Sequence, residues 1–369
     1  MTNKINGLIA SGFTVILMVV GVSEKRSMNV PVYYQPILAP NGLKRWLHTI
    51  WLIKRSLFNY PQRSIRLLKE AEKAGYKGFG KWRMLAVLSN FLKVRTDWVH
   101  FAYGTMAVER AFIGRVLGAK VSMSLRGYDI AIAPLMNKGM YANVWPYLDK
   151  VHSISNDLIE VARKHGMPDT LAFEVIPPAI DAEKFTSPDG RLWNAKPHFL
   201  TVARLHWKKG LEYTLEALAM LDVDFSYTII GEGPERERLL FAAYQLGIAD
   251  KVHFVGRKDQ DAIIDAMHAH DIYLQYSIQE GFCNAVLEAQ AAGMLCIVSD
   301  AEGLAENVQH LKTGWVVEKR NAKLLTQTIQ LVNHLSNEER NTISKAAKKR
   351  VVDIFTLSKQ REQFMQFYQ

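Results

Sequence analysis

Two glutamates, Glu280 and Glu288, stand where an expected strand gives way to an expected helix. The apolar run at 272–277 predicts a buried parallel strand ending just before Glu280, and Asn284 opens a helix over 284–293 that carries Glu288. Both carboxylates would therefore lie on the rim of an open α/β sheet, where ligands bind. A helix amino terminus between them offers N–H groups and a positive dipole end to a phosphate. This arrangement suits a sugar nucleotide.

Basic residues follow an earlier strand. In the run HFLTVARLHWKKG, a buried strand is followed by Arg204 and then by Lys208 and Lys209, before a helix that starts after Gly210. Cations at the carboxyl end of a strand can hold a diphosphate through charge-assisted hydrogen bonds of roughly 1.5–3 kcal/mol each. The alternative is a solvated basic loop without a ligand.

A second strand, FSYTII, ends in a tight turn formed by Gly231, Glu232, Gly233 and Pro234. Proline suits the first turn of the helix that follows. A dinucleotide-binding loop requires a third glycine, and Arg236 lies in that region instead. The pattern therefore does not support a nicotinamide cofactor.

The ordered motifs ARLHWKKG, GEGPE, VHFVGR, EGFCNAVLE, SDAEGLAENV and TGWVV, within 198–318, resemble the carboxyl-terminal half of the retaining GT-B glycosyltransferases of family 4. The resemblance implies an α/β fold with two Rossmann-like, doubly wound domains facing a cleft. We expect an acceptor-binding domain over 1–180 and a nucleotide-sugar-binding domain over 181–369, in which a helix at 355–369 packs back on the first domain. Prolines and a glycine mark the expected linker region: Pro177, Pro178, Pro188, Gly190 and Pro197.

The same resemblance implies roles for individual residues. Arg204 and Lys209 would bind the donor diphosphate, Glu280 the transferred sugar and Glu288 the ribose, with Glu280, Arg204 and Lys209 as the catalytic set. The full donor-binding set is Arg204, Lys209, Gly233, Glu280, Gly281, Phe282, Cys283, Asn284 and Glu288. Glu306 is either a further donor contact or a solvent-facing glutamate at a helix start.

The implied activity is transfer of a sugar, with retention of configuration, from a UDP- or GDP-type sugar to a lipid-linked or polysaccharide acceptor. Such enzymes build bacterial cell-surface polysaccharides, including exopolysaccharide and lipopolysaccharide. Because cations already supply the counter-charge of the phosphates, we expect neither a metal nor another cofactor.

On the acceptor side, the run LRGYDI places Arg126 and Asp129 opposite the donor in the resemblance, with His100 at the end of an expected strand. The family's more usual histidine is absent from the LRGYDI run. A buried structural pair of Arg126 with Asp129, and a structural His100, are the alternatives.

The start of the chain departs from the family pattern. KINGLIASGFTVILMVVG is expected to form the first helix and the second strand, so the first strand and its glycine-rich loop are missing from the pattern. A truncated start, a segment from elsewhere that fills the gap, and a degraded gene product all remain open. A catalytically impaired nucleotide-sugar-binding protein, acting as a partner, is thus the alternative function.

The same apolar segment could also be a signal-peptide core or a short anchor. Its sixteen mostly apolar residues fall below the roughly 20 that span a bilayer. We expect no transmembrane helix.

Charge is unevenly divided along the 369 residues, whose net charge is +10. Residues 1–178 hold 24 Lys and Arg against 11 Asp and Glu, and within 44–95 these cations alternate with aromatic and aliphatic residues. Such a basic amphipathic surface favours anionic lipid headgroups, whereas no nucleic-acid-binding module is recognisable. Two cysteines, Cys283 and Cys296, fit a reducing cytoplasm. We therefore expect a cytoplasmic protein that is peripheral at the inner face of the membrane.

Overall fold

The computed structural model describes residues 2–20, 30–38, 42–186 and 191–369. The chain forms two compact units. Unit 1 comprises Met1–Ser153, Ile159–Val175 and Phe364–Gln369, and unit 2 comprises Ile154–Leu158 and Ile176–Gln363. Two residues of the expected linker, Pro188 and Gly190, lie outside the described residues.

Unit 2 is built on a six-stranded parallel sheet in the order β12-β11-β10-β7-β8-β9. Its strands are β7 (His198–Val202), β8 (Ser226–Ile230), β9 (Val252–Phe254), β10 (Ile272–Gln275), β11 (Leu295–Ser299) and β12 (Trp315–Val317). The chain moves outward from β7 in one direction and then crosses over to β10 on the other side. This is the strand order of doubly wound dinucleotide-binding folds, which have a topological switch point between β7 and β10.

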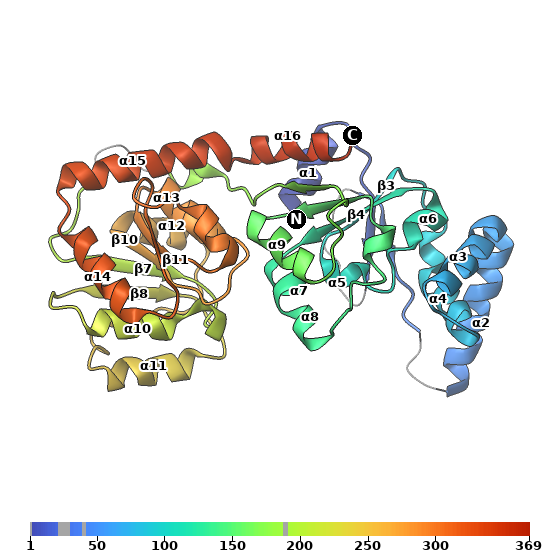
Figure 1. Cartoon of the computed structure of the whole chain (residues 1–369), viewed down its shortest axis with the longest axis horizontal. Helices are drawn as coiled ribbons and strands as arrows, with labels where there is room; N and C mark the ends of the chain where they lie inside the picture. The colour runs from blue at the N-terminus through green and yellow to red at the C-terminus, as the bar shows by residue number, and fades with distance from the viewer. Residues whose placement is uncertain (1, 21–29, 39–41, 187–190) are drawn as a thin grey trace. The chain divides into compact units, whose positions relative to one another are not determined.

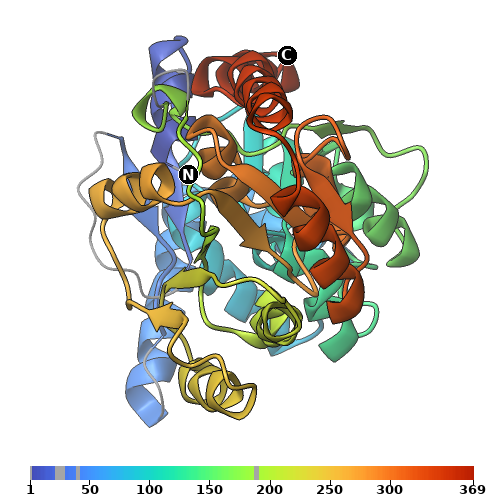
Figure 2. The ribbon, with the colours of Figure 1, turned by 90° about the vertical axis from the view of Figure 1, so that its left-hand side faces the viewer.

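Helices cover the sheet of unit 2, as Figures 1 and 2 show. They are α10 (Leu211–Ala219), α11 (Arg236–Gln245), α12 (Gln260–Ala269), α13 (Asn284–Ala291), α14 (Ala322–Asn333) and α15 (Asn337–Ile354). Every residue of β10 and β11 is buried, as expected for strands covered on both faces. The predicted strand and helix around Glu280 are confirmed as β10 and α13.

Side-chain caps fix where α12, α14 and α15 begin. Asp259 Oδ1 accepts a hydrogen bond of 3.0 Å from the N–H of Ala262 at the start of α12. Ser336 and Glu339 form a reciprocal capping box at the start of α15. These local signals agree with the tertiary fold.

Unit 1 contains two parallel sheets. One joins β1 (Leu17–Val19) to β2 (Val32–Tyr34), and the other has the order β3-β4-β5-β6. The strands of the second sheet are β3 (Trp98–Phe101), β4 (Lys120–Leu125), β5 (Lys150–Ser153) and β6 (Phe173–Val175). Among the described residues, no strand pairing joins β1 to β3. This is the place where the family pattern has its first strand.

The early helices of unit 1 are α1 (Thr2–Ala10), α2 (Gly42–Asn59), α3 (Pro61–Lys73) and α4 (Phe79–Leu88). Shorter helices follow, α5 (Gly104–Ala107), α6 (Ile113–Leu117), α7 (Gly127–Ala131) and α8 (Ala133–Met136), and then α9 (Asn156–Lys164), which spans the two units. Figure 1 shows α2, α3 and α4 packed side by side. None of the helices formed by the described residues combines the length and apolarity that crossing a bilayer requires.

The last helix, α16 (Leu357–Phe367), begins in unit 2, and residues from Phe364 onward belong to unit 1. Tyr368 contributes its backbone carbonyl as acceptor for the Trp98 indole N–H at 2.9 Å, and its ring lies 5.7 Å from the Trp98 ring. The expected return of the carboxyl-terminal helix to the first domain is confirmed.

A cluster of basic and hydroxyl side chains lies beneath this carboxyl-terminal segment. Lys4 Nζ is 3.3 Å from His100 Nε2 and 3.7 Å from the centroid of the Phe364 ring. The two ring nitrogens of His100 lie 2.7 Å from Ser122 Oγ and 2.8 Å from Ser124 Oγ. Burial, with a smaller contribution from the charge of Arg126, lowers the pKa of Lys4 to about 7. Burial also holds the pKa of His100 well below its usual range.

We predict that Lys4→Met raises the thermal stability of the protein at pH 7. The folded pKa of Lys4, about 7, lies below its ordinary value of 10.5, so the unfolded chain binds more protons between these values and stability rises with pH across this window. At pH 7 and below, the charged amine lowers stability by on the order of a few kcal/mol. Methionine removes this penalty and keeps the apolar contacts.

The measurement is the unfolding midpoint of both proteins from pH 6 to pH 10. The gain from Lys4→Met should shrink as the pH rises. Lys323→Met, at an exposed position on α14, is the control and should show no such trend. A pH-independent difference between Lys4→Met and the wild type would contradict the burial argument.

Candidate functional site

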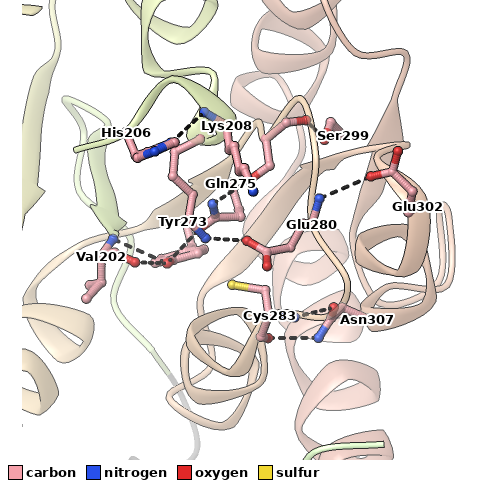
Figure 3. Close-up of polar contacts among 12 residues, drawn as sticks. Val202, His206, Lys208, Tyr273, Gln275, Glu280, Cys283, Ser299, Glu302 and Asn307 are labelled. Atoms are coloured by element: carbon pink, nitrogen blue, oxygen red, sulfur yellow. Dashed lines mark hydrogen bonds and ion pairs between the residues drawn. The ribbon is translucent and has the colours of Figure 1, made fainter. Parts of the chain in front are cut away.

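The predicted donor residues meet at the carboxyl edge of the unit 2 sheet. Arg204 to Gly210 follow β7, and Ile278 to Asn284 follow β10, its direct neighbour in the sheet. The loops after two adjacent strands flanking a topological switch point leave a crevice that commonly binds ligands. Figure 3 shows Glu280 and Cys283 in this region, close to Glu302 and Asn307.

An ion pair joins the two loops. Lys209 Nζ contacts a carboxylate oxygen of Glu280, and the two side chains are 17% and 19% exposed. Burial by itself lowers the pKa of Lys209, but the charge of the adjacent Glu280 carboxylate and its hydrogen bond to the ammonium group act in the opposite direction, and the net shift of that pKa is upward. Lys209 is therefore a cation at neutral pH, held in place by Glu280.

The same two loops are also joined through their backbones. The carbonyl of Lys208 accepts hydrogen bonds from the N–H groups of Ile278, at 2.7 Å, and Gln279, at 3.3 Å. Gly210 has φ +59°, and a Cβ at this position would lie 2.1 Å from the carbonyl oxygen of Tyr276. Only glycine permits this close approach of the two chains.

Arg204 extends from the β7 loop into solvent. It is exposed and makes no hydrogen bond or ion pair with any residue the structure describes. Burial and the positive charge of Arg204 lower the pKa of Lys208, which places both cations in the same electrostatic environment. Positive charge is thus concentrated beside the Lys209–Glu280 pair.

The segment between β10 and α13 is held by two side chains. Glu302 Oε2 accepts a hydrogen bond of 3.1 Å from the N–H of Glu280. The amide of Asn307 accepts from the N–H of Cys283 at 3.1 Å and donates to its carbonyl at 2.9 Å. Sequence reasoning missed both roles. The only feature of the sequence that pointed to Glu302 and Asn307 was their place in the SDAEGLAENV motif.

Buried polar side chains fix the carboxyl end of β10 from below. Gln275, which is 1% exposed, donates to Ser277 Oγ at 2.9 Å and accepts from Tyr273 OH at 3.2 Å. Ser299 at the end of β11 donates to the carbonyl of Ser277 at 2.6 Å. Because each buried polar group has a partner, this network limits the motion of the loop that carries Glu280.

The first turn of α13 faces the same region. Cys283 occupies the N-cap position and provides no side-chain cap hydrogen bond of the usual oxygen type. Burial raises the pKa of the Cys283 thiol to about 11, so the sulfur is neutral at physiological pH. The dipole of α13 is therefore not neutralised by a charge at its cap.

Glu288 lies one turn into α13 and differs from Glu280 in its environment. Burial raises its pKa to about 7, and no hydrogen bond or ion pair links its carboxyl group to any described residue. Glu288 thus differs from Glu280, whose carboxylate has a lysine partner.

Two further glycines permit tight packing next to the site. A Cβ on Gly233 would lie 2.2 Å from the carbonyl oxygen of Leu205, and one on Gly231 would lie 1.9 Å from that of Ala203. The turn after β8 is thus pressed against the loop that carries Arg204. Gly233 is therefore needed for this close packing, whether or not it also contacts the donor as the sequence predicts.

Three predicted donor-side residues have environments that the sequence did not indicate. Phe282 is buried, with its ring 5.7 Å from that of Phe355, and the Cys283 side chain is buried as well. Any donor contact of these two residues must come from the backbone. Glu306 is neither solvent-facing nor free, because its carboxylate accepts from Asn156 Nδ2 at 2.9 Å and from the N–H of Asp157 at 3.1 Å. The solvent-facing alternative for Glu306 is therefore wrong, while its contact with the donor stays a prediction.

The predicted acceptor-side residues of unit 1 are only partly brought together. His100 is tied to Ser122 and Ser124, which agrees with its structural alternative. Asp129 is buried and accepts from the Thr105 hydroxyl at 2.9 Å, and burial raises its pKa. Arg126 Nε donates to the carbonyl of Ala102 at 3.3 Å, and the guanidinium lies over the Tyr103 ring. The alternative of a buried structural pair of Arg126 with Asp129 is wrong, since no ion pair joins the two described side chains and each has another partner.

Comparison with known proteins gives a consistent result. Residues 184–350 match the family described as "Glycosyl transferases group 1". WcaL of Escherichia coli (strain K12), a putative colanic acid biosynthesis glycosyltransferase, is 27% identical over 260 residues, which cover 67% of this chain and 63% of WcaL. The amylovoran biosynthesis glycosyltransferase AmsK of Erwinia amylovora is 29% identical over 238 residues, 62% of this chain and 58% of AmsK. The chain spans less than two thirds of the length of these relatives.

A solved structure supports the fold across both units. The crystal structure of HepE from Anabaena, in complex with UDP and glucose, superposes with a TM-score of 0.67 at 15% identity, covering 92% of this chain and 85% of HepE. The parallel α/β units thus define a protein with the GT-B fold. Its segment 184–350 belongs to the group 1 glycosyl transferase family.

We predict that Lys209→Met destabilises unit 2 more than the double variant Lys209→Met/Glu280→Gln. Removal of the cation alone leaves a partly buried carboxylate without its partner, whereas the double variant has no uncompensated charge. The coupling energy should be about 1–3 kcal/mol, in the range found for residues in direct contact. Urea unfolding of the wild type, both single variants and the double variant measures it. Additive single effects would show that the pair contributes nothing to folding.

Proposed function

We propose that the protein is a retaining glycosyltransferase that moves a sugar from a UDP- or GDP-type donor to a lipid-linked or saccharide acceptor in the biosynthesis of a bacterial cell-surface polysaccharide. One observation carries the proposal. Arg204, Lys209, Glu280 and the amino terminus of α13 converge at the switch point of a doubly wound sheet. Cations and a helix dipole suit a diphosphate, and a carboxylate suits sugar hydroxyls.

The comparisons support the same class of reaction. WcaL and AmsK are described as glycosyltransferases of colanic acid and amylovoran biosynthesis. HepE has been crystallised with UDP and glucose. A nucleotide-sugar donor and a polysaccharide product are the corresponding proposals for this chain.

The donor would lie across the two loops after β7 and β10. Arg204, which has no protein partner among the described residues, is available for phosphate oxygens, and Lys209 can share its ammonium group between Glu280 and the diphosphate. Glu280 and the backbone of Gly281 to Asn284 would hold the transferred sugar and the distal phosphate. Because these cations supply the counter-charge, the proposal includes no divalent metal.

In the transfer step, the acceptor hydroxyl oxygen forms a bond to the anomeric carbon as the bond from that carbon to the phosphate oxygen breaks. The electron pair of the broken bond leaves with the nucleoside diphosphate, and the departing phosphate takes the acceptor's proton. Attack on the face that the diphosphate leaves retains the configuration. Charge grows on the phosphate in the transition state, so Arg204 and Lys209 stabilise it more than the ground state.

On the acceptor side, Arg126 and Asp129 remain candidates, while the proposal assigns no chemistry to His100. Asp129 Oδ2 is buried and lacks a hydrogen-bond partner among the described residues, so the position of this carboxyl group is costly unless something else satisfies it. A lipid-linked acceptor places the enzyme at the inner face of the membrane, peripherally attached.

We predict that Arg204→Ala and Glu280→Gln each lower kcat/KM for sugar transfer by about 100-fold or more, the usual effect of removing one preorganised polar group at a reacting centre. The assay pairs UDP- and GDP-sugars with lipid-diphosphate-linked saccharides and records both transfer and donor hydrolysis. Lys323→Ala, at an exposed position far along the chain, is the control. Near-normal transfer in both site variants would refute the proposed site. Donor binding by the wild type without transfer or hydrolysis would instead support the catalytically impaired alternative.

We further predict that Glu288 makes nucleotide binding depend on pH. Ribose hydroxyls donate to an ionised carboxylate better than to a protonated one, so UDP or GDP should bind more tightly as the pH rises through about 7, the pKa of free Glu288. Below this pH, binding should release a proton from the protein. Calorimetry in buffers of different ionisation enthalpy measures this release. The nucleotide's own phosphate also titrates, so the decisive quantity is the difference from Glu288→Gln, and equal proton release by both proteins would exclude the proposed role.

A further inference from the structure

Helix α2 of unit 1 exposes several large apolar side chains to solvent, whereas a surface helix usually buries them. On α2, Leu43, Leu47, Trp51 and Phe58 are exposed by 71%, 54%, 54% and 87%. Their spacing places them along one face of the helix. We call these four residues the α2 stripe.

The opposite face of α2 is buried and carries smaller polar groups. Thr49 and Ser56 are 3% and 2% exposed, with Leu52 between them. Their hydroxyls are satisfied inside the helix, because Thr49 Oγ1 donates to the carbonyl of Arg45 and Ser56 Oγ to that of Leu52, both at 2.8 Å. The packing of α2 against α3 and α4 therefore does not use the α2 stripe.

The charges around the stripe are almost all positive. The 18 residues of α2 include four cations and no acidic residue, and residues 42–96 hold 13 Lys and Arg against two Glu. Lys44 and Lys54 are exposed beside the stripe. Arg55 lies over the Trp51 ring at 4.8 Å, so the indole is presented together with a cation.

From this combination we infer that the α2 stripe, with Lys44 and Lys54, docks the protein on the surface of an anionic lipid bilayer. Apolar side chains along a helix without acidic residues enter the boundary between headgroups and acyl chains, while lysines reach the anionic headgroups. Tryptophan favours that boundary because its ring is apolar and its N–H is polar.

Other occupants fit less well. A nucleic acid would match the cations but offers no apolar phase for Leu43, Leu47 and Phe58. The helix itself is not long and apolar enough to span the bilayer, so it would lie in the plane of the interface. The inference deepens the proposed function, since it names the surface that would bring the enzyme to a lipid-linked acceptor, and its test requires no sugar transfer.

The experiment is flotation of the full chain with phosphatidylcholine vesicles, with and without phosphatidylglycerol, at low and high salt. The wild type should float with the anionic vesicles, and less so at high salt. Leu47→Ser/Trp51→Ser/Phe58→Ser should lower the partition coefficient by about 100-fold or more, as expected for loss of three large apolar side chains. Lys44→Gln/Lys54→Gln should lower it by roughly 30-fold, at about fivefold for each charge near the surface.

Matched controls come from unit 2. Phe241→Ser/Tyr244→Ser removes two exposed aromatic side chains from α11, and Lys323→Gln/Lys345→Gln removes two exposed lysines, and neither should change flotation. Circular dichroism and UDP binding establish that each variant is folded.

Three outcomes would overturn the inference. In the first, the stripe variant floats as well as the wild type. In the second, the wild type does not float. In the third, the wild type self-associates and the stripe variant does not, which would make the stripe an interface between two copies. A protein that floats as predicted but transfers no sugar would keep the docking surface and refute the proposed function. A protein that transfers sugar but does not float would support the proposed function and refute the docking surface.

Discussion

The contact between Lys209 and Glu280 is the constraint on which the rest of the site depends. These residues come from loops after adjacent strands, and a largely buried charge on either one is tolerable only beside the other. The surrounding structure keeps them in register, since the Lys208 carbonyl joins the same loops and Gly210 lets their backbones approach. In the proposed reaction a diphosphate would meet a lysine whose position is already fixed, so little conformational entropy would be lost on binding.

The two glutamates that define the motif are chemically different in the fold. Glu280 has a cation beside it, whereas burial without a partner raises the pKa of Glu288 to about 7. One residue type thus supplies a carboxylate paired with a lysine at the end of β10 and a buried carboxyl group with a raised pKa one turn into α13. This division follows from burial and charge in three dimensions, and the eight-residue spacing alone does not contain it.

The sequence predicted the elements that have a strong local signal. The buried run before Glu280 became β10, because apolar continuity acts over a few residues, and α13 begins at Asn284 as predicted, although its N-cap is Cys283 and no side chain caps it. Contacts between distant residues were not predictable in the same way. Asn307 holds Cys283 from 24 positions away, and Arg126 prefers the Ala102 carbonyl and the Tyr103 ring to Asp129. The sequence indicated a basic amphipathic surface within 44–95 but not the α2 stripe itself, since periodicity reveals an apolar face but not which face the fold buries.

Charge and apolar surface must act together if unit 1 is to select a membrane. The donor of the proposed reaction is itself an anion, so a surface with cations alone would also attract free nucleotide sugars and other polyanions, an attraction that salt weakens. The α2 stripe adds a contribution that soluble anions cannot exploit, because burial of apolar area needs an apolar phase. The cations raise the rate of encounter with any anionic partner, and the stripe restricts lasting attachment to a bilayer. Under the proposed function, nucleotide sugars would then remain available to the cations of unit 2, where the Lys209–Glu280 pair and the amino terminus of α13 would provide the directed contacts that the α2 surface lacks.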